Sequence, residues 1–581
     1  MSLHPPLREA AELWLAEDPD PQTAGQLRAL IERYDRGDRA AAHELHESFH
    51  GRLEFGTAGL RGILGPGPQR MNRVLVRQVT AGLAAYLTAH GGDPSRGVVI
   101  GYDGRHKSRV FAEDTARVLA GAGFVALLAH RPWPTPTTAW AVVDRNAIAG
   151  VMITASHNPA AYNGYKVYWA NGAQIIPPHD TGIAAAIAQV AARQRSDQLA
   201  MPDLEQARRG KLVIDLDEAV HDRYLAAVTE LRARPDLDGN QIVIAYTPLH
   251  GVGAASVEPA MLRSGFSGLS TEPSQRAPDP DFPTVAFPNP EEAGAMDLVI
   301  ALAKRLHADL VLANDPDADR LCVAVPEADS YRLLTGDQVG ALLADYLLEV
   351  SPKDKRMVAT TIVSSQLLSY LAQATGADYR ETLTGFKWIG NAAMAYEQQT
   401  GGRFVIGYEE ALGYSVGPLV RDKDGVSACV LFAELVAWNR ARSRSVLEHL
   451  DDIYRRIGIF VTEQVSITQP GSEGLAKIRA AMVAFRSAPP QRIAGHAVEQ
   501  VVDLLRGAGD LPASDVLVFK LTGGRRIIMR PSGTEPKLKS YYEVRTPIAA
   551  GESVENARSR GLADLAQLRD AHQALLSAQT P

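Results

Sequence analysis

The sequence has 581 residues, of which 46% are hydrophobic and 22% charged, so it predicts a globular protein of several domains. Its net charge of −7 gives no general basic field for nucleic acid or an anionic membrane, so an anionic ligand needs a local cluster of cations. The two cysteines, Cys322 and Cys429, form no CxxC pair, which excludes a disulfide framework and a cysteine-based zinc site. The N-terminus lacks the apolar core of a secretory signal, and no segment approaches the ~20 apolar residues of a membrane helix. We therefore expect a soluble, cytoplasmic protein.

The first fifty residues predict amphipathic helices, because Leu, Ala and Ile recur at spacings of three and four in REAAELWLAED and AGQLRALIERYD. After them, short β-branched strands alternate with Ala- and Leu-rich helices, which indicates α/β domains. From about residue 460 the strands DVLVFKL and RRIIMRP precede a terminal helix. We predict a helical extension at 1–50 and four domains, at 51–208, 209–330, 331–460 and 461–581.

Ser156 lies in the segment VMITASHNP, where an apolar run ends directly before Asn-Pro. By itself this pattern fits two readings: a nucleophile presented at the end of a strand, or a serine in a turn.

Three aspartates alternate in NDPDADR, which follows the predicted strand ADLVLA: Asp315, Asp317 and Asp319. In an extended segment alternate side chains point to one face, so these carboxylates converge and could bind Mg²⁺, which takes oxygen ligands. An EF-hand loop is excluded, because its sixth and twelfth positions would be Arg320 and Pro326 instead of Gly and Glu. The alternative is a solvated acidic turn, and the position at a strand end favours the metal.

Two glycine-containing loops could bind an anion or simply form turns. In GTAGLRG, at 56–62, the glycines and Arg61 could surround an anion. In MRPSGTEPK, backbone amides, two hydroxyls and a guanidinium could bind one phosphate, through Arg530, Ser532, Gly533 and Thr534.

The segment GYEEALGY, at 407–414, places Glu409 and Glu410 directly after the strand RFVI. Ionised carboxylates only accept hydrogen bonds, so this pair suits sugar hydroxyls, although glutamates are also typical of a first helical turn. YTPLHGVGAAS resembles a dinucleotide-binding fingerprint through Gly251 and Gly253, but its third glycine is replaced by Ser256. The sequence has no GxxxxGK[ST] loop, which argues against a nucleotide kinase of that type.

Five of these segments, GTAGLRG, TASHNP, NDPDADR, GYEEALGY and RPSGTEPK, in this order over residues 50–581, resemble the α-D-phosphohexomutase family. That family includes phosphoglucomutases, phosphomannomutases and phosphopentomutases. The length, the helical extension and TLTGFKWIG are most similar to the longer phosphoglucomutase/phosphopentomutase branch. The resemblance implies an α/β fold with four domains around a central cleft, three of them related mixed-sheet α/β domains and the fourth a distinct α+β C-terminal domain.

The resemblance also implies roles for individual residues. Ser156 would carry the phosphate, and an oxygen of that phosphate would join the three aspartates around one Mg²⁺ ion. Arg61, His157 and Lys166 would lie at the proton-transfer site. The substrate-binding residues would be those that supply a local positive field, hold sugar hydroxyls or hold the phosphate that is not reacting: Arg105, Arg320, Lys387, Glu409, Glu410, Arg530, Ser532, Gly533 and Thr534.

A mutase needs a phosphate relay and two phosphate positions, and phosphorylated Ser156 would supply the relay through a sugar bisphosphate intermediate. His157 has a suitable ordinary pKa for proton transfer, whereas Lys166 serves as a base only if its pKa is lowered. We expect a monomer or small homo-oligomer that acts on a small phosphosugar and binds neither nucleic acid nor membrane.

The preferred substrate pair is glucose 1-phosphate and glucose 6-phosphate, with mannose phosphates also possible. The alternatives are a phosphopentomutase for ribose or deoxyribose 1-phosphate, a sugar phosphatase and an NAD-dependent dehydrogenase. Many hexose mutases have serine where this sequence has Ala411, so we expect relaxed sugar specificity.

Overall fold

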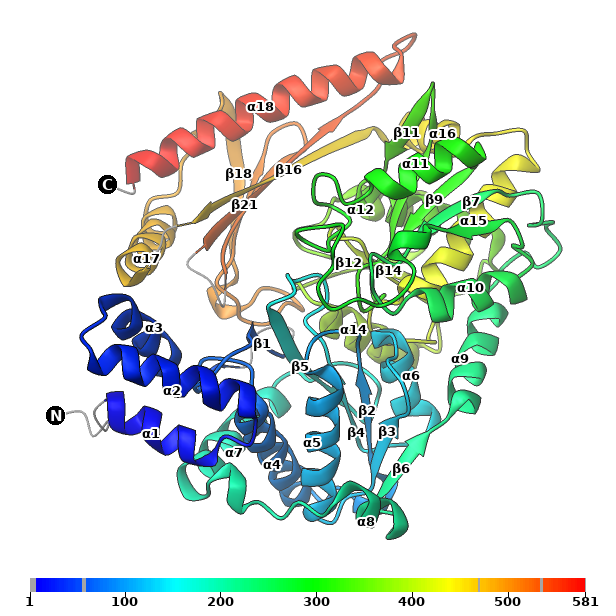
Figure 1. Ribbon diagram of the computed structural model, residues 1–581. Helices are drawn as coiled ribbons and strands as arrows, with labels where there is room; N and C mark the ends of the chain where they lie inside the picture. Colours follow the sequence, from blue (N-terminus) through cyan, green and yellow to red (C-terminus); the bar gives the residue numbers. More distant parts are fainter. Residues whose placement is uncertain (1–6, 55–58, 469–470, 533–536, 580–581) are drawn as a thin grey trace. The chain divides into compact units, whose positions relative to one another are not determined.

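The computed structural model describes residues 7–54, 59–468, 471–532 and 537–579 (Figure 1). The chain divides into two compact units. The first contains Met1–Leu334 and Gly413–Ala437, and the second contains Thr335–Leu412 and Trp438–Pro581. No helix among the described residues is both long and apolar enough to cross a membrane.

Three helices form the N-terminal extension of the first unit: α1 (Leu7–Glu17), α2 (Pro21–Asp35) and α3 (Arg39–Phe49). The side chains of Asp20 and Asp38 accept hydrogen bonds from free backbone N–H groups at the starts of α2 and α3, which explains where these helices begin. Trp14, Leu27 and Leu45 form a small core with Val74 of α4 (Arg73–Ala89), so the extension packs on the first α/β domain.

The first α/β domain is built on a mixed sheet of six strands in the order β1-β5-β4-β2-β3-β6. Strands β4, β2, β3 and β6 are parallel, whereas β5 runs antiparallel to both β4 and β1. Every residue of β2, β3 and β4 is buried, as is typical of parallel strands covered by helices on both faces. The strands are β1 (Leu60–Ile63), β2 (Val98–Tyr102), β3 (Ala126–Ala129), β4 (Ala149–Ile153), β5 (Tyr162–Trp169) and β6 (Val213–Leu216), and the helices are α4 (Arg73–Ala89), α5 (Ser108–Gly121), α6 (Thr135–Asp144), α7 (His179–Arg193) and α8 (Leu204–Arg209).

The second α/β domain of this unit has a five-stranded mixed sheet in the order β11-β10-β9-β7-β8. Strand β7 runs parallel to β8 and β9, and the β9–β10–β11 segment is antiparallel. The elements are β7 (Ile244–Thr247), β8 (Leu269–Thr271), β9 (Leu310–Ala313), β10 (Cys322–Glu327), β11 (Ser330–Leu333), α9 (Glu218–Glu230), α10 (Ala254–Arg263) and α11 (Asp297–Leu306). The chain later returns to the first unit with β15 (Gly413–Val416) and most of α15 (Gly425–Arg440).

The second unit contains the third α/β domain, in which β12 lies between β13 and β14 and is parallel to both. Its elements are α12 (Gly336–Val350), β12 (Arg356–Thr361), α13 (Leu367–Thr375), β13 (Asp378–Thr382), α14 (Phe386–Thr400), β14 (Arg403–Glu409) and α16 (Val446–Ile457). Single-turn 3-10 helices in the whole described chain lie at Pro94–Arg96, Ser196–Gln198, Pro273–Gln275 and Leu504–Arg506.

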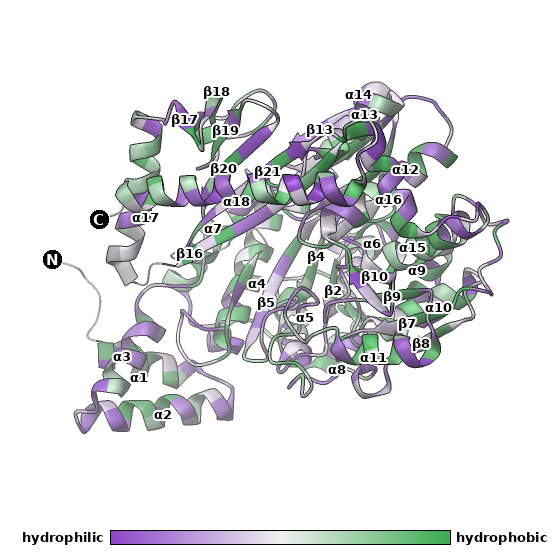
Figure 2. Cartoon of the chain, turned by 90° about the horizontal axis from the view of Figure 1, so that it is seen from above, coloured by the Kyte–Doolittle hydropathy of each residue, from purple (hydrophilic) through white to green (hydrophobic). Residues whose placement is uncertain are grey.

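The C-terminal domain has a different architecture, because its sheet is antiparallel with the order β16-β21-β20-β19-β18-β17. Helix α18 packs on β16 and β21, and Figure 2 shows hydrophilic and hydrophobic residues alternating along it. The predicted fold class, with three α/β domains and a distinct α+β C-terminal domain, is confirmed. The elements are β16 (Ile459–Thr468), α17 (Gly471–Ser487), β17 (Arg492–Ile493), β18 (His496–Asp503), β19 (Leu517–Leu521), β20 (Arg525–Pro531), β21 (Lys537–Thr546) and α18 (Val554–Gln579).

Candidate active site

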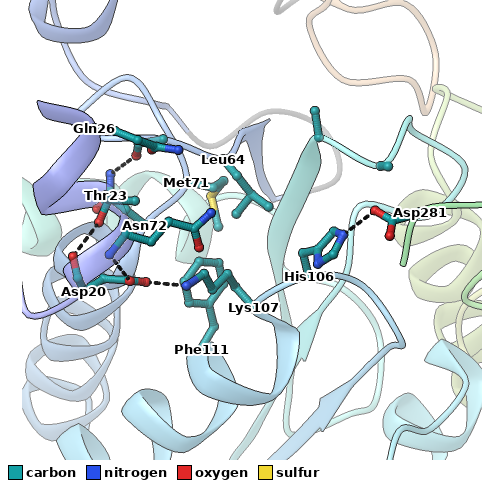
Figure 3. Close-up of a pocket in the computed structure, with 14 residues that line it drawn as sticks. Asp20, Thr23, Gln26, Leu64, Met71, Asn72, His106, Lys107, Phe111 and Asp281 are labelled. Atoms are coloured by element: carbon teal, nitrogen blue, oxygen red, sulfur yellow. Dashed lines mark hydrogen bonds and ion pairs between the residues drawn. The ribbon is translucent and has the colours of Figure 1, made fainter. Parts of the chain in front are cut away.

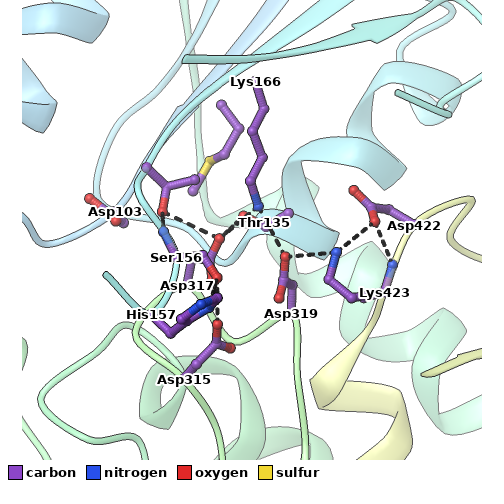
Figure 4. A network of polar contacts seen from close by, with 12 residues as sticks. Asp103, Thr135, Ser156, His157, Lys166, Asp315, Asp317, Asp319, Asp422 and Lys423 are labelled. Carbon is purple, nitrogen blue, oxygen red and sulfur yellow. Dashed lines mark hydrogen bonds and ion pairs between the residues drawn. The ribbon is translucent and has the colours of Figure 1, made fainter. Parts of the chain in front are cut away.

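Ser156 lies in the loop that follows β4, and its backbone has a φ of +52°. This left-handed conformation is uncommon for a residue other than glycine, so the surrounding contacts must hold it. The Ser156 N–H donates to Thr154 Oγ1 at 2.8 Å. Its hydroxyl donates to Asp315 Oδ2 at 2.7 Å and lies 3.2 Å from His157 Nδ1 (Figure 4). The turn therefore presents the serine oxygen to the aspartate loop of the second α/β domain.

Arg105 holds the loop that carries Ser156. Its guanidinium is almost fully buried and donates to the carbonyl oxygens of Ser156 at 2.5 Å and Pro159 at 2.9 Å, and also to those of Asn158 and Tyr162. Its Nε lies 3.3 Å from Asp103 Oδ2. Because Arg105 uses these donors on the backbone, the structure favours a positioning role over the predicted contact with substrate.

Asp315, Asp317 and Asp319 follow β9 and are completely buried. One oxygen from each lies within 4.8 Å of the others, and no other group of three acidic, histidine or cysteine side chains in the described chain does this. Asp317 Oδ1 and Asp319 Oδ1 have no hydrogen-bond partner among the described residues. Buried carboxylate oxygens that converge without donors suit a hard divalent cation, so these residues fit Mg²⁺.

Lys166 of β5 lies between two of these carboxylates, with Nζ 2.9 Å from Asp317 Oδ2 and 3.0 Å from Asp319 Oδ2. Burial alone would lower the pKa of Lys166, but Asp317 and Asp319 outweigh it and hold the pKa well above its ordinary value. With both carboxylates beside it, Lys166 is held as an ammonium ion in this arrangement. Burial and the neighbouring carboxylates raise the pKa of Asp315, whereas the Lys166 ammonium keeps the pKa of Asp317 low against burial.

His157 differs from Lys166 because its pKa is lowered well below the ordinary value, by burial first and then by the cations Arg320 and Arg61. It is neutral near pH 7 and can accept a proton on the nitrogen that faces Ser156. Arg61 extends from β1 and donates to Asn158 Oδ1 at 3.0 Å. Arg320 Nε lies 3.8 Å from Asp319 Oδ1 and 3.9 Å from Asp315 Oδ2, so these cations form the local positive cluster.

Lys423 is a site residue that the sequence analysis missed. Its Nζ lies 3.3 Å from Asp319 Oδ2 and 3.2 Å from Asp422 Oδ1. Asp422 is buried and accepts hydrogen bonds from Tyr168 Oη at 2.8 Å and Gln174 Nε2 at 2.7 Å. The charged segment RDKDG directly before the apolar helix α15 was the available signal. Thr135 was also missed, and it donates to Asp317 Oδ2 at 2.7 Å.

In the second unit, Glu409 ends strand β14 and its Oε1 accepts a hydrogen bond from the Gly385 N–H at 2.6 Å. Lys387 is in the first turn of α14, two residues further along. Ser364 Oγ donates to Glu410 Oε2 at 3.0 Å and accepts from the Glu410 N–H at 3.1 Å. Each carboxylate of the predicted sugar-binding pair is therefore oriented by a specific donor.

Arg530 is near the end of β20 and pairs with Lys539 of β21, and the Ser532 N–H donates to the Lys537 carbonyl at 2.7 Å. Burial raises the pKa of Tyr541, Glu410 adds to this effect, and Arg530 opposes it. Glu410 and Arg530, which the sequence assigns to sugar and phosphate, thus both influence the pKa of Tyr541. Gly533 and Thr534 lie outside the described residues, as do the residues 56–58 of GTAGLRG.

The glycines of the dinucleotide-like segment have a packing role. A Cβ at Gly251 would lie 2.3 Å from Pro316 Cα, and a Cβ at Gly253 would lie 2.5 Å from Tyr246 Oη. The Val252 N–H donates to the Pro316 carbonyl at 2.9 Å. Gly251 is needed because its backbone packs against the aspartate loop, and Gly253 because it faces the Tyr246 hydroxyl. Packing therefore explains both glycines without a bound dinucleotide.

A separate cavity of about 310 Å³ lies between the N-terminal extension and the first α/β domain (Figure 3). An ion pair between Lys107 Nζ and Asp20 Oδ2 at 2.8 Å and a hydrogen bond between His106 Nε2 and Asp281 Oδ1 at 2.7 Å face it. None of the predicted site residues lines this cavity.

The fold thus presents Ser156 to a buried cluster of three aspartates that could hold a divalent cation. Four models of the phosphoglucomutase/phosphomannomutase family match the chain in order. They are alpha/beta/alpha domain I at 52–194, domain II at 222–328, domain III at 335–457 and the C-terminal domain at 476–558. The chain belongs to the phosphoglucomutase/phosphomannomutase family.

Two relatives support this membership, and one solved structure has the same fold. The chain is 42% identical over 480 residues to a protein of Haemophilus influenzae named "Probable phosphomannomutase", which covers 82% of this chain and 93% of that protein. It is 38% identical over 582 residues to the "Probable phosphoribomutase" of Schizosaccharomyces pombe, with 96% of each chain covered. A phosphoglucomutase/phosphomannomutase family protein from Burkholderia thailandensis shares the fold, with a TM-score of 0.66, 19% identity and coverage of 91% of this chain and 97% of that one.

Proposed function

We propose that this protein is a Mg²⁺-dependent phosphosugar mutase that moves a phosphate between the 1-position and the 5- or 6-position of a sugar. The observation that carries the proposal is the 2.7 Å hydrogen bond from Ser156 Oγ to Asp315 Oδ2, within a buried group of three aspartates. A phosphate on this oxygen would lie beside the carboxylates that fit the cation. Ser156 and the three aspartates come from different α/β domains, and their contact across the two loops supports the proposal.

The reaction follows from the residues around Ser156. A free sugar hydroxyl attacks the phosphorus of phospho-Ser156, the new oxygen–phosphorus bond forms, and the bond to Ser156 Oγ breaks. Neutral His157 accepts the proton of the sugar hydroxyl and passes it to Ser156 Oγ, which lies 3.2 Å from its Nδ1. The ammonium of Lys166 stabilises the negative charge of the transferred group. The three aspartates would hold the Mg²⁺ ion, which would neutralise charge on the transferred group when bound.

The product of this transfer is a sugar bisphosphate, which must turn round before the other phosphate returns to Ser156. Residues of the second unit are suited to hold it: Glu409 and Glu410 accept from sugar hydroxyls, and the loop that starts at Arg530 binds the phosphate that is not reacting. A catalytic amount of glucose 1,6-bisphosphate should therefore activate enzyme whose serine has lost its phosphate.

Glucose 1-phosphate is the substrate we expect the enzyme to prefer, and ribose or deoxyribose 1-phosphate is the alternative. The two relatives described above are named for mannose and ribose phosphates, and Ala411 removes one candidate sugar contact. We expect relaxed specificity, measured as kcat/KM over glucose, mannose, ribose and deoxyribose 1-phosphates. A preference above about 10⁴-fold for one sugar would contradict it, because such discrimination requires a dedicated buried polar contact.

The direct test is Ser156→Ala, followed by formation of glucose 6-phosphate from glucose 1-phosphate. We expect essentially complete loss of turnover, and intact-protein mass should show one phosphate on the wild type that the variant lacks. A fully active variant would exclude the phosphoserine. Inorganic phosphate released by the wild type faster than glucose 6-phosphate forms would instead identify a phosphatase.

A further inference from the structure

The loop at 362–366, between β12 and α13, is held by two charged side chains of the C-terminal domain. Arg526 of β20 is 4% exposed and donates from Nη1 to the Ile362 carbonyl at 3.0 Å and from Nη2 to the Ser364 carbonyl at 2.5 Å. Glu543 is its cross-strand partner on β21 and accepts from the Gln366 N–H at 2.9 Å. The carbonyl groups and the N–H group of one loop are thus bound by an arginine and a glutamate that lie side by side. We refer to Arg526 and Glu543 as the loop clamp.

The other side of this loop holds the sugar-binding segment. Ser364 makes the two hydrogen bonds to Glu410 described above, and the Ser365 N–H donates to Asp337 Oδ1 at 2.9 Å. The Glu410 backbone also lies directly against Gly336, where an added Cβ would be 2.0 Å from the Glu410 carbonyl oxygen. A movement of residues 362–366 would therefore carry Glu410 with it.

The loop clamp is not needed to hold the two domains together. Ile362 and Val363 already share an apolar core with residues of the C-terminal sheet, among them Val518, Ile528 and Tyr541. A buried ion pair adds little net stability beside such a core, because removing the charges from water offsets most of their attraction. The hydrogen bonds of Arg526 fix the position of the loop instead. Apolar side chains can slide past one another, whereas two hydrogen bonds from one guanidinium hold two carbonyl groups at fixed positions.

The clamp is also on the strand that leads to the phosphate loop. Arg526 and Arg530 are both on β20, and their even separation places them on the same face of the strand. Arg530 and the Arg526 side of the loop clamp are therefore parts of one strand. Glu410 is connected to that strand through Ser364, whose carbonyl Arg526 binds.

We infer that Arg526 and Glu543 are positioning residues that fix the spacing between the sugar-binding Glu410 and the phosphate-binding Arg530. This inference rests on the proposed mutase function. The spacing sets which distance between a hydroxyl and a distal phosphate fits the site, and that distance differs between a hexose 6-phosphate and a pentose 5-phosphate. The clamp therefore determines how the enzyme ranks hexose and pentose phosphates.

The test compares Arg526→Lys with a control on the neighbouring residue. Lysine keeps the charge but cannot bind two carbonyls as a fork. Arg525 belongs to the same strand but pairs with Asp564 of α18 at 3.0 Å, so Arg525→Lys removes a similar fork without touching the loop. We expect Arg526→Lys to raise KM for glucose 1-phosphate about tenfold or more and to change the ratio of kcat/KM for glucose and ribose 1-phosphates, whereas Arg525→Lys keeps wild-type values.

Hydrogen exchange gives a readout independent of activity. The amides of Gln366 and Glu410 should exchange faster in Arg526→Lys and at the wild-type rate in Arg525→Lys, because their acceptors depend on the clamp. If Arg526→Lys does not fold, Glu543→Gln decides the matter, since it keeps the acceptor for Gln366 and removes the charge that faces Arg526. It should shift KM and the sugar ratio in the same direction, about threefold or more.

The outcomes separate the two proposals. Wild-type protein without mutase activity overturns the proposed function and with it the basis of the inference. A mutase whose folded clamp variant keeps wild-type KM, sugar ratio and exchange overturns the inference alone. A shift shared equally by Arg525→Lys also overturns it, because that result reports general loosening of the sheet.

Discussion

Replacing Arg105 by lysine should disable the phosphoserine loop without removing any atom that reacts. The guanidinium of Arg105 donates to four carbonyl groups of the loop, including that of Ser156 itself. A lysine ammonium offers its donors from a single nitrogen, so it reaches at most about two of those carbonyls. The charge beside Asp103 is kept, which protects the buried carboxylate from being left unpaired.

The size of the effect follows from the lost bonds. A hydrogen bond from a charged donor contributes about 1.5–3 kcal/mol, so the loss of two weakens the hold on the loop by about 3–6 kcal/mol. The left-handed backbone of Ser156 itself costs about 1–3 kcal/mol, so the weakened loop relaxes away from it. A displacement of the reacting oxygen by about 1 Å lowers the rate about 10²-fold. We expect a fall in kcat of that order.

The assay is formation of glucose 6-phosphate, with kcat and KM determined separately and the phosphate on Ser156 measured by mass. A positioning role lowers kcat and slows phosphorylation of the serine, whereas a direct contact with substrate phosphate raises KM and leaves kcat unchanged. Arg109→Lys is the matched control, because Arg109 is exposed on α5 and pairs with Glu113 at 3.0 Å. An Arg105→Lys variant with kcat within about twofold of the wild type would refute the reasoning.

Three further changes test other parts of the site. Asp319→Asn should raise the Mg²⁺ concentration needed for half-maximal activity sharply, because it removes a charged ligand, and an unchanged Mg²⁺ titration would contradict the cation site. Gly336→Ala should raise KM for glucose 1-phosphate about tenfold, because its Cβ would lie 2.0 Å from the Glu410 carbonyl oxygen, and an unchanged KM would show that the loop can move aside. Burial raises the pKa of Asp337 from 3.8 to about 8, with Glu410 and Glu543 adding to the shift, so the folded protein keeps a proton that the unfolded chain has lost. Stability from this group is complete below pH ~4 and falls by at most about 6 kcal/mol as the pH rises to ~8, a loss that urea unfolding should show in the wild type and not in Asp337→Asn.

The sequence predicted the parts of the site that depend on short segments. Ser156 and the three aspartates follow buried strands and end them in polar loops, which marked them as candidates. The choice between a nucleophile and a turn for Ser156 came from the resemblance of five segments in a fixed order. The roles of Arg105 and Lys166 depend on partners that are 51 and 151 residues away in sequence, so spacing gave no indication of them. The same holds for the pKa of Lys166, whose direction is decided by two carboxylates from another domain.

The return of residues 413–437 to the first unit also could not be predicted. Gly413 bridges to Arg320, Asp424 accepts from Tyr224 Oη at 2.8 Å, and Glu434 accepts from Arg232 at 2.8 Å. These are single polar contacts between segments that are far apart in the sequence. Such contacts leave the hydrophobic pattern of either segment unchanged, so the pattern does not reveal them. Lys423 was missed for this reason, because only the folded chain brings it to Asp319.

Lys166 gives the aspartate cluster a cation that belongs to the polypeptide. Three carboxylates buried so close together would repel one another strongly, and the ammonium of Lys166 lies against two of them. We therefore expect the chain to fold before a divalent ion binds, and we expect chelation to remove such an ion without unfolding the domain. Loss of the metal would then be reversible, and adding Mg²⁺ back should restore the site without a refolding step.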